Sequence, residues 1–139
     1  MNQRQVRQLF PQWMRIFLRS CFAYNFFWAI VLLAFTPAFV KWITGSEYVN
    51  AYQVELHGVG LFILSGIFLL TSYYPIRFWY LIAFGFLTKT FGWIWVYFSI
   101  MQQNVTTQFL IHLFVNDFIW AAALSFIAYK AFRLYMLMD

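Results

Sequence analysis

The sequence predicts an all-α integral membrane protein, a four-helix bundle with an N-terminal amphipathic interfacial helix. Hydrophobic residues make up 64% of the 139 positions and charged residues only 9%, whereas a soluble domain usually carries about 25% charged residues. Four apolar runs approach the roughly 20 residues that a helix needs to cross a bilayer. No run shows the alternation, about ten residues long, of a transmembrane strand. We therefore expect one transmembrane domain over residues 1–139.

The first element is the stretch "VRQLFPQWMRIFLRS" at residues 6–20. On a helix, Leu9, Trp13 and Ile16 would share one face, while Arg15 and Arg19 would lie on another. A proline is accepted in the first turn of a helix, so "P" at position 11 does not oppose one. The stretch predicts either a helix lying in the membrane interface or the solvated start of the first span.

The four spans follow at residues 21–40, 56–74, 78–101 and 109–129. The first run is longer than the apolar core of about 7–15 residues in a cleaved secretory signal, so we expect it to stay as a span. Its Cys21 is the single cysteine of the chain and is expected to be a buried apolar filler. A single cysteine leaves no disulfide and no dithiol pair within the chain.

The basic residues are distributed unevenly between the two ends of these spans. Seven of the nine flank the termini or the loop between the second and third spans, and the opposite loops hold Lys41 beside Glu47 and Glu55. By the positive-inside rule, this predicts a bacterial inner-membrane protein with both termini in the cytoplasm. The net charge of +5 therefore points to anionic membrane lipids as partners, with no role in nucleic-acid binding.

Ionisable side chains inside a span are costly, about 2.5–3.5 kcal/mol at the centre of a helix, and so mark candidate functional positions. Lys89 lies near the middle of the third span, and Asp117 about 12 Å from the outer end of the fourth at 1.5 Å per residue. His57 and His112 lie closer to the outer surface. We expect these four polar groups to converge in the outer half of the bundle.

Small residues indicate which faces of the spans pack together. Gly85, Thr88 and Gly92 surround Lys89, which predicts that Lys89 faces the bundle interior, and Gly58 with Ser65 predicts a packing face on the second span. The predicted polar cluster, which is ligand-binding or structural, comprises His57, Lys89, His112, Asn116, Asp117 and Trp120.

Three interpretations of this cluster remain open: a Lys89–Asp117 pair that fixes the helices, a ligand or transport cavity, and a catalytic site. No His-x-x-x-His or Glu-x-x-His spacing is present, so no metal is predicted, and no cofactor is expected.

The segments "HGVG", "GFLTKTFG" and "VNDFIW", within residues 57–120, resemble those of small four-span bacterial membrane proteins that are distantly DoxX-like. The resemblance implies a four-helix fold and draws attention to Lys89, Asn116, Asp117 and Trp120. Some members of that group carry redox labels such as alkyl hydroperoxide reductase, whose chemistry needs a cysteine pair that this chain lacks.

The expected function is binding of a lipid-like or small hydrophobic ligand, or service as a membrane subunit beside other subunits or further copies of the chain. The alternative is a membrane-embedded enzyme of isomerase type, with Asp117 and a histidine as acid and base.

Overall fold

The computed structural model describes residues 2–46 and 51–138, and every regular element within these ranges is a helix. Four helical segments are long and apolar enough to cross a membrane: Gln12–Ala34, Ala51–Tyr73, Trp79–Ser99 and Thr107–Tyr135. The predicted fold class, an all-α membrane bundle of four spans, is confirmed.

The N-terminal stretch forms two helices. α1 (Gln3–Gln8) begins with a capping box, in which the Asn2 side chain accepts from the backbone N–H of Arg4 and Gln5 accepts from the N–H of Asn2. α2 (Gln12–Ala34) starts after Pro11. Residues 12–20 are thus the first turns of α2, and α1 is a separate short helix before it.

The first span ends earlier than the sequence analysis expected. α2 stops at Ala34, and a separate helix, α3 (Thr36–Thr44), follows with Pro37 in its first turn. A proline inside α2 would lack the N–H for its helical hydrogen bond and its ring would clash with the preceding turn, so the chain turns here. The prediction that the span reaches residue 40 is wrong. α3 ends at Gly45, whose φ of 71° favours glycine.

The remaining spans are α4 (Ala51–Tyr73), α5 (Trp79–Ser99) and a composite fourth span. The fourth span consists of α6 (Thr107–Leu113), a π-helical turn η1 (Phe114–Phe118) and α7 (Ile119–Tyr135). It runs several residues beyond the predicted end at 129.

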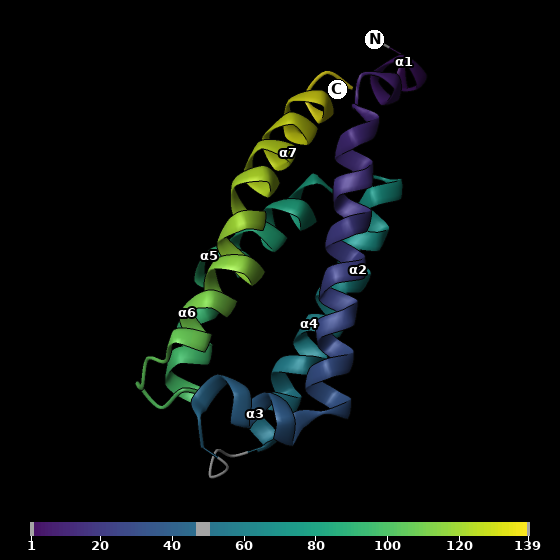
Figure 1. The fold of residues 1–139 in the computed structure, drawn as a ribbon. Coiled ribbons are helices and arrows are strands. Elements are labelled where there is room, and N and C mark those ends of the chain that lie inside the picture. The colour runs from purple at the N-terminus through teal and green to yellow at the C-terminus, as the bar shows by residue number, and fades with distance from the viewer. Residues whose placement is uncertain (1, 47–50, 139) are drawn as a thin grey trace.

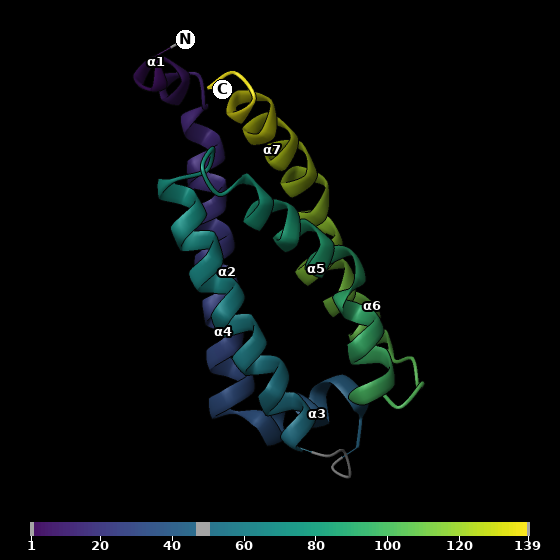
Figure 2. The same cartoon turned by 180° about the vertical axis from the view of Figure 1, so that it is seen from behind.

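α1 and the end of α7 lie at one end of the bundle, here called the terminal end, and the 74–78 turn lies on the same side, set back toward the middle (Figures 1 and 2). α3 and the 100–106 turn lie at the other, the α3 end. α2 packs mainly on α4, and α5 mainly on α7, while α3 joins the two pairs by packing on both α4 and α6. The hydroxyl of Thr106 caps α6 and donates to the carbonyl of Ile43, which fixes this junction. Glu47, which the sequence places in the outer loop, lies outside the described residues.

Glycines confirm one predicted packing face and correct another. A Cβ on Gly58 would lie 2.9 Å from Leu33, and one on Gly85 would lie 2.6 Å from the buried ring of Phe68, so both permit close helix contact. Gly92 was expected to pack in the same way as Gly85, but a Cβ there would meet nothing within 4 Å. That part of the prediction is wrong, because Gly92 lies beside open space and not against a neighbouring helix.

Candidate functional site

The centre of the site is the ammonium group of Lys89 on α5, whose side chain is only 2% exposed. Its Nζ donates to the side-chain Oδ1 of Asn25 at 2.8 Å and to the backbone carbonyl of Asn116 at 3.0 Å. The Asp117 Oδ1 lies 3.6 Å from the same nitrogen. An ammonium has three N–H donors: two of them bond to the oxygens of Asn25 and Asn116, and the Asp117 carboxylate is close enough for an ion pair. Lys89 faces the bundle interior, as predicted, and connects α2, α5 and η1.

In the π-helical turn η1, two backbone carbonyls accept hydrogen bonds from side chains. The N–H of Ile119 bonds to the carbonyl of Phe114, five residues back, where an α-helix would bond four residues back. Within the widened turn, the carbonyl of Asn116 accepts from Lys89, and that of Val115 accepts from the indole N–H of Trp120 at 3.0 Å. Such turns often occur at functional sites because they change which backbone groups are available to side chains.

Asp117 connects this buried network to a cavity. Its Oδ1 accepts from the side-chain amide of Asn116 at 3.2 Å, and its side chain is 15% exposed. The Oδ1 of Asn116 is buried and has no hydrogen-bond partner among the described residues. The carboxylate is therefore held from the protein side by Lys89 and Asn116, while part of it still faces open space.

Asn25 on α2 completes the network and was missed by the sequence analysis. It is fully buried, donates from Nδ2 to the carbonyl of Cys21 at 2.7 Å and accepts from Lys89. The sequence analysis considered polar groups on the second, third and fourth spans, whereas the signal for this residue was a single amide within the apolar run "CFAYNFFWAIV" of the first span. Cys21 itself is buried with a free thiol, as expected.

A cavity of about 410 Å³ lies between α4 and α5. Four polar side chains, His57, Thr88, Lys89 and Asp117, line it. The remaining lining is apolar apart from two glycines: Leu56, Gly60, Leu61, Ile63, Leu64, Ile67, Phe84, Gly92, Trp95 and Val96. We call this space the α4–α5 cavity.

Two of the residues that line the α4–α5 cavity are glycines, Gly60 and Gly92. A Cβ on either Gly60 or Gly92 would meet nothing within 4 Å. Ile63 and Phe84 on the rim are 60% and 49% exposed, so in a membrane the opening would face lipid chains. The ring of His57 stacks on Trp95, with 5.6 Å between ring centroids.

Two predicted members of the polar cluster lie elsewhere. His112 is buried among the rings of Trp28, Phe39 and Trp42, with centroids 4.9–6.0 Å away. Trp120 packs against Phe17 and Tyr24. Neither His112 nor Trp120 is among the described residues that line the α4–α5 cavity. The expected convergence of four polar groups thus holds for His57, Lys89 and Asp117, and His112 belongs to an aromatic cage built by α2 and α3.

Across the described ranges, no group of three or more histidine, cysteine, aspartate or glutamate side chains is arranged to hold a metal ion. The chain matches no protein-family model, no characterised protein sequence and no solved structure. The resemblance to DoxX-like proteins therefore stays a prediction.

Proposed function

We propose that the protein binds a lipid-like or small hydrophobic molecule in the α4–α5 cavity. The supporting observation is a largely apolar cavity between two candidate membrane spans, lined by both members of an ion pair. Its volume of about 410 Å³ falls within the range of about 300–1,000 Å³ that ligand pockets occupy. We also propose that the protein resides in a bacterial inner membrane with cytoplasmic termini, from its basic residues.

The hydrogen bonds of the site favour one class of ligand. Lys89 donates hydrogen bonds to two oxygens of the protein and forms an ion pair with Asp117. The hydroxyl of Thr88 donates to the carbonyl of Gly85. The exposed part of the Asp117 carboxylate therefore offers an acceptor to the cavity, and the imidazole of His57 lies on the same lining. A carboxylate accepts hydrogen bonds, so the ligand would carry a hydroxyl or amine beside a long apolar body.

Cavity-filling substitutions test this proposal. Gly60→Leu and Gly92→Leu would place a side chain inside the α4–α5 cavity, where nothing obstructs a Cβ. Gly66→Leu is the matched control, because Gly66 is equally unobstructed on α4 but does not line the cavity. Purified protein would be examined by native mass spectrometry and lipid extraction.

We expect one apolar species to be retained by the wild type and by Gly66→Leu, and to be lost from Gly60→Leu and Gly92→Leu. Equal retention in all four proteins would contradict a ligand in this cavity.

An isomerase is the second proposal, because Asp117 and His57 line the same cavity. His112 is a poorer candidate for the base, since aromatic rings enclose it. If the protein catalyses an isomerisation, the species extracted from the wild type and from Asp117→Asn should have equal mass but different chromatographic retention. Identical retention would leave binding as the function.

A further inference from the structure

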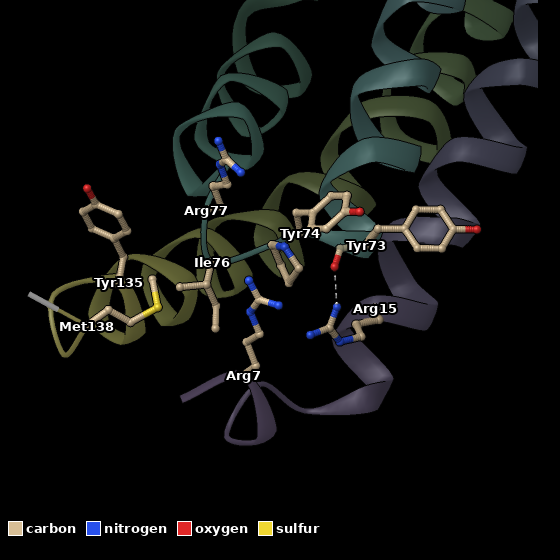
Figure 3. A pocket seen from close by; sticks show the side chains of 9 residues that line it. Arg7, Arg15, Tyr73, Tyr74, Ile76, Arg77, Tyr135 and Met138 are labelled. Atoms are coloured by element: carbon tan, nitrogen blue, oxygen red, sulfur yellow. Dashed lines mark hydrogen bonds between the residues drawn. The ribbon is translucent and has the colours of Figure 1, made fainter. Parts of the chain in front are cut away.

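A second cavity lies at the terminal end, and three arginines line it; it shares no lining residue with the α4–α5 cavity. Its volume is about 270 Å³, and it sits beneath the 74–78 turn, between the start of the chain and the end of α7 (Figure 3). Arg7, Arg15 and Arg77 line it, and none of its described lining residues is acidic. We call this space the arginine pocket.

Arg15 is held in place before any ligand arrives. Its Nη1 donates to the carbonyls of Ser72 and Tyr73, at 3.1 and 3.0 Å, at the C-terminal end of α4. Its guanidinium also lies 5.3 Å from the centroid of the Phe10 ring. Both of these hydrogen bonds use Nη1, so the N–H groups on Nε and Nη2 have no partner among the described residues and stay available. An arginine fixed in this way loses little further side-chain freedom when it binds an anion.

Arg7 is brought to the same pocket by the fold of α1. Val6 and Phe10, on either side of it in the sequence, are buried in the core cluster that also contains Ile76 and Leu134. The guanidinium groups of Arg7 and Arg15 both point into the space beneath the 74–76 segment (Figure 3). Arg77 points away from them, and its guanidinium lies over the ring of Phe78.

No carboxylate among the described residues lines the pocket, and two cations that converge there repel each other, so a bound anion would relieve this repulsion. Guanidinium groups match phosphate oxygens particularly well, because their N–H donors form a planar fork. Ile76, Tyr135 and Met138 add an apolar wall to the pocket. A basic pocket with an apolar wall, at the end of membrane-spanning helices, has the character of a headgroup site.

We propose that the arginine pocket binds a phosphate group, presented by the headgroup of an anionic phospholipid. This site is separate from the α4–α5 cavity, so the proposal stands or falls independently of the ligand proposed there. A bound headgroup would join α1, the end of α4 and the end of α7 at the membrane surface.

The test uses the full-length protein in detergent, titrated with phosphatidylglycerol or phosphatidylcholine and followed by native mass spectrometry. The primary variant is Arg7→Gln. Its matched control is Arg4→Gln, an exposed arginine on the same helix that does not line the pocket. Arg15→Gln also removes the two bonds to the end of α4, so it is informative only if the variant remains folded.

We expect the wild type and Arg4→Gln to retain phosphatidylglycerol over phosphatidylcholine. Loss of one charge-assisted contact should make binding of phosphatidylglycerol to Arg7→Gln about tenfold weaker. A competition arm with inorganic phosphate distinguishes the sources: little displacement supports the lipid, and displacement at low phosphate concentration shows a free anion in its place. Equal binding of phosphatidylglycerol by Arg7→Gln and Arg4→Gln would overturn the proposal.

Discussion

The buried ion pair supplies the sharpest prediction, because the structure makes its two partners unequal. Lys89 lies 3.6 Å from Asp117, but it also donates to two other oxygens at 2.8 and 3.0 Å. At an effective dielectric constant of about 20, two unit charges at this separation attract by about 4–5 kcal/mol before the cost of desolvation. Each single substitution breaks this attraction, but with different consequences for the groups left behind.

Lys89→Met should be the more damaging change. It leaves the Asp117 charge without a cation and also removes the donor from Asn25 and from the carbonyl of Asn116. Breaking a buried pair typically lowers the free energy of unfolding by about 3–5 kcal/mol. In Asp117→Asn, by contrast, Lys89 keeps two acceptors. We therefore expect the free energy of unfolding to fall by about 3 kcal/mol, the lower limit of this range.

The double variant should recover part of the combined loss, because no unpaired charge remains. Coupling between contacting residues is usually about 0.5–3 kcal/mol, and recovery is incomplete because Asn25 and the Asn116 carbonyl still lack their donor. The assay is unfolding in mixed micelles followed by circular dichroism, with Lys130→Met at the terminal end as a control for loss of a lysine. Strictly additive losses, or a larger loss from Asp117→Asn than from Lys89→Met, would refute the reasoning.

Three further predictions use the same unfolding assay or simple labelling. Gly85→Ala adds a Cβ 2.6 Å from a buried ring and should lower the free energy of unfolding by about 1–3 kcal/mol. Gly92→Ala should be neutral, because a Cβ there meets nothing within 4 Å. Equal melting temperatures for the two variants would show that the helices are not in close contact at Gly85. Asn25→Leu removes an acceptor from a buried ammonium and should lower the free energy of unfolding by about 1.5–3 kcal/mol. Asn25→Asp retains an acceptor and should lower it by less. The reverse order would argue against the contact between Asn25 and Lys89. A membrane-impermeant maleimide added outside intact cells should label a cysteine at position 104 but not one at position 4, and labelling at position 4 would invalidate the proposed orientation.

The sequence alone determined the number of spans and the class of fold. A bilayer requires long apolar helices whose backbone hydrogen bonds are satisfied internally, and this requirement can be tested by composition and length. It also determined that Lys89 faces inward and that Asp117 lies near it, because an intramembrane charge needs a partner and small residues mark the contacting face. The end of α2 at Ala34 could also have been predicted from the sequence, because Pro37 cannot continue a helix from the preceding turn.

Only the tertiary structure decided which residues share a cavity. In a membrane, lipid chains are as apolar as the protein interior, so hydrophobic periodicity does not show which face of a span is buried. For this reason Gly92 and Gly85 looked alike in the sequence, although one faces the α4–α5 cavity and the other a buried ring. The π-helical turn that aims the Asn116 carbonyl at Lys89, and the crossing that brings Asn25 to the same ammonium, depend on how whole helices pack. Such contacts between distant segments of the chain are set by packing geometry, which no local sequence pattern records.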